Sequence, residues 1–136
     1  MKALSLHPEN AAAVAWGDKL VEYRTWQTKY RGPLLICASA KKTAGFLTGY
    51  ALCVMNLEEI YHFPDGSYGW RFSPYPTGKS YHIEPFPVKG RQRLFEVDED
   101  LIKPVKWEQE GQVNLSQARE WFDQVYQPLI IANKWF

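Results

Sequence analysis

The sequence predicts a mostly β protein of the α+β class: a small barrel of about six strands, with one short helix near the N-terminus and another near the C-terminus. Three observations predict it. Short stretches rich in β-branched and aromatic residues recur along the chain. Gly and Pro residues separate them. The chain has 136 residues, which suits one domain with a substantial core. Short strands joined by such turns are typical of small barrels.

The N-terminal part predicts a strand and then a short helix. Residues 2–6 alternate as a strand does. Pro8 suits the first turn of a helix, where its missing N–H is not needed. Residues 11–16 have high helix propensity, and Gly17 suits the position just past a helix end.

Two strands and a polar loop follow, and the candidate site is built on them. Residues 21–25 combine β-branched and aromatic side chains with charges, and residues 34–38 are continuously apolar. The second strand is therefore predicted to be buried on both faces. The loop between them is polar and aromatic and ends in Gly32 and Pro33.

Alternation along the first of these strands separates charged from apolar side chains. If Val21 and Tyr23 face the core, Glu22 and Arg24 share the opposite face, with Lys19 close by. The sequence thus predicts cations and a carboxylate on one exposed wall beside the aromatic rings of the loop.

The middle of the chain completes the predicted sheet. Residues 48–61 read as a long strand bent near Asn56, and Pro64 to Gly66 is a turn signal. Pro85 and Pro87 cannot donate ladder hydrogen bonds, so their segment belongs at an edge or leaves the sheet. The remaining predicted segments are a strand over 68–73, a loop over 74–80, an extended stretch over 81–87, a basic loop over 88–93, a closing strand over 94–97 and an acidic turn over 98–100.

The C-terminal part predicts one helix after an irregular segment. Asn114 can cap it, and Pro128 ends or kinks it. The apolar stripe that is predicted to dock on the barrel comprises Leu115, Ala118, Phe122, Val125 and Leu129. For the apolar tail, including Trp135 and Phe136, two interpretations stay open: cover of a sheet edge, or self-association.

Charge and composition narrow the function classes. The net charge is +1, but residues 17–93 carry +5 and residues 94–136 carry −4, which permits a face that binds polyanions. Cys37 and Cys53 lie in apolar strands, and the His residues lack ligand spacing, so we expect neither a metal nor another cofactor. We also expect no signal peptide, no membrane span and a cytoplasmic protein.

Several short motifs, taken in order, resemble the ASCH (activating-signal-cointegrator homology) family. They are Leu4-Ser5-Leu6-His7-Pro8, Gly17-x-Lys19, Glu22-x-Arg24-x-Trp26, Tyr30-Arg31-Gly32-Pro33, Ala38-Ser39, Tyr68-Gly69-Trp70 and Pro85-x-Pro87-Val88-Lys89-Gly90-Arg91-Gln92 with Leu94-Phe95. The resemblance covers residues 2–97. It divides the chain into an ASCH barrel over 2–97 and a C-terminal extension over 98–136 with one helix.

The resemblance implies a PUA-like β-barrel with a cleft near Lys19, Glu22, Arg24 and Trp26, and it implies binding of RNA or other nucleic acid. Some members are enzymes, and a ribonuclease activity has been associated with the family. One branch is similar to acetylcytidine amidohydrolases, which use a Lys equivalent to Lys19, a Thr three positions later and a distant Glu. Here Glu22 stands at the Thr position, which argues against that chemistry.

Two hypotheses from different classes follow for one basic, aromatic-lined cleft. In the first, it binds RNA or a nucleotide: cations meet phosphates, and aromatic rings stack on unpaired bases. The predicted binding residues are Lys19, Glu22, Arg24, Trp26, Tyr30, Arg31, Lys41, Trp70, Lys89 and Arg91, with Arg93 as a further phosphate contact. In the second, it hydrolyses a modified nucleoside or RNA, with Lys19 and Glu22 as the acid–base pair.

A structural role remains open for the same residues. Glu22 and Arg24 would equally form a surface salt bridge, and Trp26 would equally plug the barrel. A third hypothesis is a protein-interaction domain that uses the C-terminal helix and tail.

Overall fold

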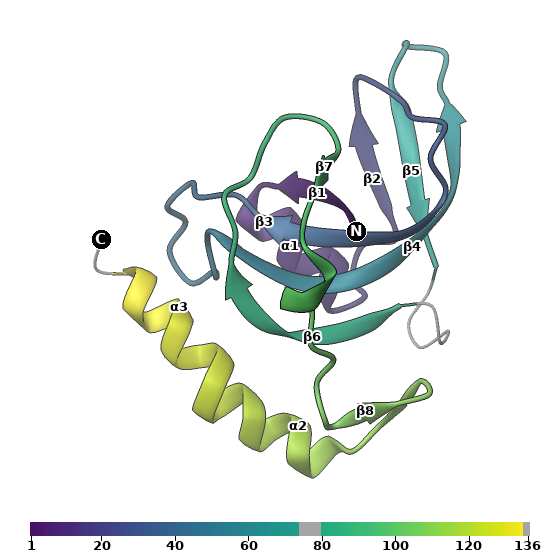
Figure 1. The fold of residues 1–136 in the computed structure, drawn as a ribbon. Helices are drawn as coiled ribbons and strands as arrows, with labels where there is room; N and C mark the ends of the chain where they lie inside the picture. Colours follow the sequence, from purple (N-terminus) through teal and green to yellow (C-terminus); the bar gives the residue numbers. More distant parts are fainter. Residues whose placement is uncertain (74–79, 135–136) are drawn as a thin grey trace.

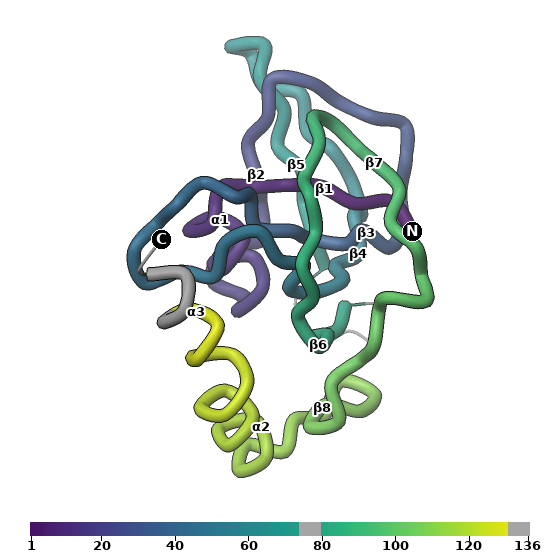
Figure 2. Tube along the Cα trace, turned by 60° about the vertical axis from the view of Figure 1, so that its left-hand side comes forward, coloured from purple at the N-terminus to yellow at the C-terminus, as the bar shows by residue number. Residues whose placement is uncertain are grey.

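The computed structural model describes residues 1–73 and 80–134, with side chains to residue 130, and Figures 1 and 2 show two views of it. The strands are β1 (Lys2–Leu6), β2 (Val21–Arg24), β3 (Gly32–Ala38), β4 (Tyr50–His62), β5 (Tyr68–Phe72), β6 (Tyr81–Pro87), β7 (Phe95–Glu96), β8 (Glu108–Gln109) and β9 (Gln112–Val113). The helical segments are α1 (Pro8–Ala15), η1 (Glu99–Leu101), α2 (Leu115–Trp121), η2 (Phe122–Tyr126) and α3 (Gln127–Lys134). The loop predicted over 74–80 falls outside the described residues except for Ser80.

Seven of the described strands form one open sheet. Its order is β2-β5-β4-β3-β1-β7, with β6 added to β4. β1 and β3 are parallel, and the other pairs are antiparallel. The predicted α+β class with strands dominant is confirmed, but the closed barrel of about six strands is wrong: within the described residues, the end strands β2 and β7 do not pair. These strands have only four and two residues, too few for a closing ladder.

The long strand β4 connects the two halves of the sheet (Figure 1). Its first part pairs with β3 and β6, and its last part pairs with β5. The register with β5 shifts between Leu57 and Glu59, next to the bend predicted near Asn56. Asn56 is buried there, and its Nδ2 donates to Ser73 Oγ at 3.3 Å. Beyond the bend, the end of β4 forms a separate part of the sheet with β5 and β2, which we call the wing. Arg24 of the candidate site lies in this wing, at the end of β2.

The core lies on both faces of β3. One cluster, which includes Leu34, Ile36 and Trp70, packs between the sheet and α1. The other, which includes Leu35 and Cys37, lies on the opposite face. The prediction that this apolar strand is buried on both sides is confirmed.

The shorter N-terminal elements also agree with their predictions. Pro8 lies in the first turn of α1, and Gly17 follows the helix with a φ of +82°, a conformation that favours glycine. Among the described strands β6, which carries Pro85 and Pro87, pairs with β4 alone in the sheet, as an edge strand should.

The C-terminal helix begins as predicted, and only part of its predicted face packs. Asn114 Oδ1 accepts the backbone N–H of Gln117 at 3.1 Å, so the predicted cap is confirmed. The predicted docking stripe is confirmed for Phe122 and Leu129, which pack against the core, and is wrong for Leu115 and Val125, which are 71% and 37% exposed. The other residues of this segment that pack against the core are Trp121, Tyr126 and Ile130.

A π-helical turn interrupts the segment. In η2 the backbone N–H of Gln127 donates to the carbonyl of Phe122, five residues back. This wider turn departs from the α-helical period, and the exposed Val125 lies within it, whereas the exposed Leu115 precedes it. Pro128 does not end the helix, which continues as α3 to Lys134. Trp135 and Phe136 lie outside the described residues, so self-association of the tail stays a prediction.

Hydrogen bonds join α1 to β6, and β6 to the C-terminal extension. His82 Nε2 lies 2.8 Å from the carbonyl oxygen of Ala15, which can only accept, so Nε2 carries a proton. Glu108 accepts the backbone N–H of His82 at 2.8 Å and lies 3.1 Å from its Nδ1. Trp121 Nε1 donates to Glu84 at 2.8 Å. Figure 2 shows the extension below the sheet, with α3 ending near the loop after β3.

The two thiols are free and buried. Burial raises the pKa of Cys37 to about 12 and also raises the pKa of Cys53. We expect no reaction of the native protein with a disulfide reagent at pH 8, and two equivalents of reaction after unfolding in urea, because the thiolate is the reactive form. Rapid reaction of either thiol in the folded protein would contradict this expectation.

The raised pKa values also set a pH dependence of stability. The unfolded thiol has a pKa of about 8.5, below the folded value. Neutral burial of Cys37 and Cys53 therefore stabilises the fold fully below about pH 8.5, and this contribution declines as the pH rises toward 12.

Among the described residues, no helix is both long and apolar enough to cross a membrane.

Candidate nucleic-acid interface

A basic groove of about 670 Å³ lies between the end of β2, the end of β3 and the loop after β6. Arg24 and Trp26 form one wall, and Ser39 and Ala40 lie at the β3 end. The loop after β6 supplies residues 89–93. The complete lining is Ser5, Arg24, Trp26, Ser39, Ala40, Lys89, Gly90, Arg91, Gln92 and Arg93.

Trp26 is held at the centre of this wall by contacts on several sides. The guanidinium carbons of Arg24 and Arg93 lie 5.7 and 5.1 Å from the centre of its ring, within the range of cation–π attraction. The ring of Trp70 meets it edge-on with centroids 4.7 Å apart, and Trp70 Nε1 donates to the Trp26 carbonyl at 3.1 Å. Two cations are thus fixed beside one flat indole.

The groove concentrates positive charge without compensation. Its lining includes Arg24, Lys89, Arg91 and Arg93 and, among the described residues, no carboxylate. Within the same part of the chain, none of these four cations forms an ion pair. Four unpaired cations around one hollow raise the local concentration of anions.

Close backbone approach sets the width of the groove. A Cβ at Gly90 would lie 2.6 Å from Ser5 Oγ and 3.0 Å from Ser5 Cβ, so the basic loop reaches β1 only with glycine there. Arg93 has a φ of +59°, a conformation that costs energy for a residue other than glycine. That conformation directs its guanidinium group over Trp26.

The alternation predicted for β2 is present with its two faces exchanged. Glu22 is 4% exposed, whereas Tyr23 is 61% exposed. Glu22 is accommodated inside because Lys19 Nζ lies 3.0 Å from its Oε2. Lys19 Nζ also donates to Asn10 Oδ1 of α1 at 3.5 Å. The predicted exposed wall is therefore wrong for Glu22, which lies in a buried ion pair outside the lining of the groove.

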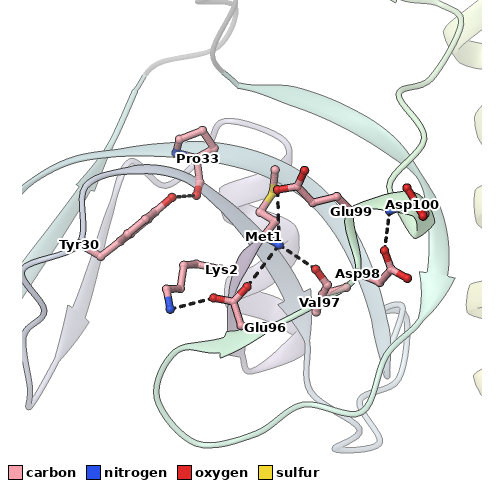
Figure 3. Close-up of polar contacts among 9 residues, drawn as sticks. All are labelled: Met1, Lys2, Tyr30, Pro33, Glu96, Val97, Asp98, Glu99 and Asp100. Carbon is pink, nitrogen blue, oxygen red and sulfur yellow. Dashed lines mark hydrogen bonds and ion pairs between the residues drawn. The ribbon is translucent and has the colours of Figure 1, made fainter.

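Three other predicted binding residues lie elsewhere. The Tyr30 hydroxyl donates to the Pro33 carbonyl, and Figure 3 shows this contact near Lys2 and the chain start. Partial burial, then the charge of Glu96, raises the pKa of Tyr30. Arg31 donates to the carbonyls of Thr28 and Tyr30, each at 2.8 Å. Lys41 is exposed, one residue beyond Ala40, and does not line the groove.

Trp70, also predicted to bind, does not line the groove either. It is fully buried in the core, so it supports Trp26 and offers no face for stacking on a base. Burial of its large apolar ring contributes to the hydrophobic core.

A separate ion-pair network surrounds the chain start (Figure 3). The N-terminal ammonium of Met1 lies 3.4 Å from Glu96 and 3.6 Å from Glu99, and Lys2 lies 2.8 Å from Glu96. These paired charges fasten β7 to β1 and contrast with the unpaired cations of the groove.

Sequence reasoning missed the small residues of the groove and one cavity. Ser5, Ser39 and Gly90 are short side chains in apolar or basic segments, and only the resemblance motifs drew attention to them. The cavity, of about 520 Å³, is lined mainly by aromatic and apolar residues between the core and α2, including Trp16, Trp107 and Phe122. Its walls come from segments far apart in sequence, so no local pattern could reveal it.

Among the described residues, no cluster of His, Cys, Asp or Glu could hold a metal ion.

Comparisons with known proteins agree on the family. The model of the ASCH domain matches residues 4–127. The crystal structure of ASCH from Zymomonas mobilis superposes with a TM-score of 0.52 at 14% identity, covering 73% of this chain and 88% of that one. A mutant of that protein that carries a serine-to-alanine substitution gives 0.54 at 14% identity, covering 75% and 96%. No curated protein matches this sequence. The match to the family model spans most of the chain, which therefore belongs to the ASCH domain family.

Proposed function

We propose that this protein binds single-stranded RNA in the basic groove. The observation that carries the proposal is the arrangement around Trp26. Two arginines lie over this one indole, and four unpaired cations line the same groove. Cations attract the phosphates of a nucleic acid, and unpaired bases stack on flat aromatic rings. The groove offers both within one wall.

The cations account for the affinity. Arg24 and Arg93 approach the hollow from β2 and from the basic loop, and Lys89 and Arg91 line it from that loop. Arginine forks match phosphate oxygens in a bidentate manner. A bound strand also relieves the mutual repulsion of the four cations.

The stack at Trp26 accounts for the preference for unpaired bases. Guanidinium and indole planes both accept a stacked base, and each such stack contributes about 1–3 kcal/mol. Bases in a duplex already stack on each other and do not reach a side wall. The free, buried thiols are compatible with the reducing cytoplasm, where we place this binding.

The test is a binding titration against salt. We expect a labelled RNA of about six nucleotides to bind with a slope of log K against log salt of about −2 to −3, because single strands contribute about −0.7 per neutralised phosphate. We expect a hairpin duplex of the same length to bind much more weakly. A slope near zero, or equal binding of strand and duplex, would contradict the proposal.

A second candidate function is hydrolysis of a modified nucleoside, favoured by the short contact between Lys19 and the buried Glu22. Incubation with N4-acetylcytidine would then release cytidine and acetate, and Glu22→Gln, which keeps the size of the side chain, would abolish the release. Recovery of unchanged nucleoside from the wild-type protein would exclude this activity.

A further inference from the structure

A row of aromatic side chains lies on the outer face of the wing formed by β2, β5 and the end of β4. Tyr23 is 61% exposed and Tyr61 is 39% exposed. Phe63 lies between them, with ring centroids 5.7 Å from Tyr23 and 6.3 Å from Tyr61. We call these three residues the outer aromatic row.

A glycine makes room for the row. Tyr23 pairs across the ladder with Gly69. A Cβ at Gly69 would lie 2.7 Å from the Phe63 ring and 3.1 Å from Val21. The Phe63 ring therefore lies against the backbone of β5, and any larger residue at position 69 would displace it.

The row is continuous with the basic groove. A second hollow of about 330 Å³ is lined by Tyr23, Arg24, Thr25, Trp26 and Ser67. Arg24 and Trp26 also line the basic groove. The two hollows thus share Arg24 and Trp26, and the second hollow adds Tyr23, which contacts Phe63.

The charges on this face are mixed, with a cation where the face meets the basic groove. Arg71 lies 2.9 Å from Glu58 and 3.2 Å from Glu59, so this one cation neutralises one of the two negative charges. Asp65 Oδ1 accepts the backbone N–H and the hydroxyl of Ser67 at 2.9 and 2.6 Å. Arg24 supplies the cation at the boundary between the two hollows.

We propose that the outer aromatic row stacks on further bases of the strand held in the basic groove. The site then binds several successive nucleotides of a single strand, on both sides of Arg24 and Trp26, and not one nucleotide alone. This inference rests on the proposed function. Exposed aromatic rings beside a cation are the surface that unpaired nucleic acid uses without sequence preference.

The test is a length series of labelled uridylate strands, from about two to ten nucleotides, with wild type and Tyr23→Ala. We expect the wild-type affinity to rise with length beyond the shortest strand that binds. We expect Tyr23→Ala to lose about tenfold for the longest strand and almost nothing for the shortest. Tyr23→Phe, which keeps the ring, should bind as wild type does.

Two further variants sharpen the result. Gly69→Ala displaces Phe63 and should reproduce the loss for long strands, whereas Leu115→Ala removes an equally exposed apolar side chain on α2 and should change nothing. Thermal unfolding verifies that each variant is folded. A parallel series of deoxyribose strands tests whether the row distinguishes RNA from DNA; equal losses in both series support stacking as the source.

The outcomes separate the two proposals. Wild-type affinity that does not change with length, while the shortest strand binds, overturns the inference and leaves the proposed function in place. Equal losses for short and long strands in Tyr23→Ala also overturn it, because the row would then act only by supporting Arg24. Absence of binding for every strand overturns both.

Discussion

Replacement of Arg24 and Arg93 together by glutamine is expected to weaken binding of a short single-stranded RNA about 100-fold at moderate salt. Each guanidinium group contributes a charge-assisted contact of about 1.4 kcal/mol, at the lower end of the range for hydrogen bonds to charged groups, and this energy corresponds to tenfold in affinity. Both groups lie over the Trp26 ring, so the variant also loses the stack that presents the indole.

The salt dependence identifies the mechanism. Loss of two phosphate contacts should reduce the magnitude of the slope by about 1.4, in addition to the loss of affinity. Glutamine retains most of the stem and is no more strained than arginine at the φ of +59° of residue 93, so the fold should be unaffected.

A matched control removes the same charge elsewhere. Lys103 and Arg119 are exposed residues of the C-terminal extension and lie outside the groove. Their double replacement by glutamine lowers the net charge equally and should change the affinity only slightly. Equal effects of the two double variants would show that bulk charge, and not the groove, attracts RNA.

Elements that depend on local chemistry were predictable from the sequence. The Pro8 and Gly17 signals located α1, Asn114 located the start of α2, and the proline pair of β6 identified an edge. Closure of the sheet was not predictable, because it depends on how far β2 and β7 extend and on the bend in β4. The π turn in η2 breaks the helical period around Val125, one of the two exposed residues of the predicted apolar stripe.

The candidate site was predictable in composition and only partly in geometry. The sequence identifies both the basic loop and the residues around Trp26. It predicts a phosphate contact for Arg93 but does not reveal the contact of Arg93 with the Trp26 ring. The faces of β2 were exchanged because alternation alone does not reveal that Lys19 compensates Glu22 from outside the strand. The ion pair joins residues only three positions apart, but its burial depends on how the segment after α1 packs, which the alternation along one strand does not reveal.

That buried pair carries the second large effect. Lys19→Ala is expected to lower the free energy of unfolding by about 2–3 kcal/mol. The reason is that Glu22, whose side chain is 6% exposed, would remain in the core without its cation. The estimate lies below the range for fully buried pairs because the Lys19 side chain is 26% exposed. Urea denaturation at neutral pH measures the change.

A second substitution distinguishes the charge from the packing. Lys19→Ala combined with Glu22→Gln should recover most of the stability, because a neutral amide costs less to bury than a carboxylate. A deficit that persists in the double variant would mean that the Lys19 stem, through its contact with α1 at Asn10, contributes the stability and that the ion pair does not.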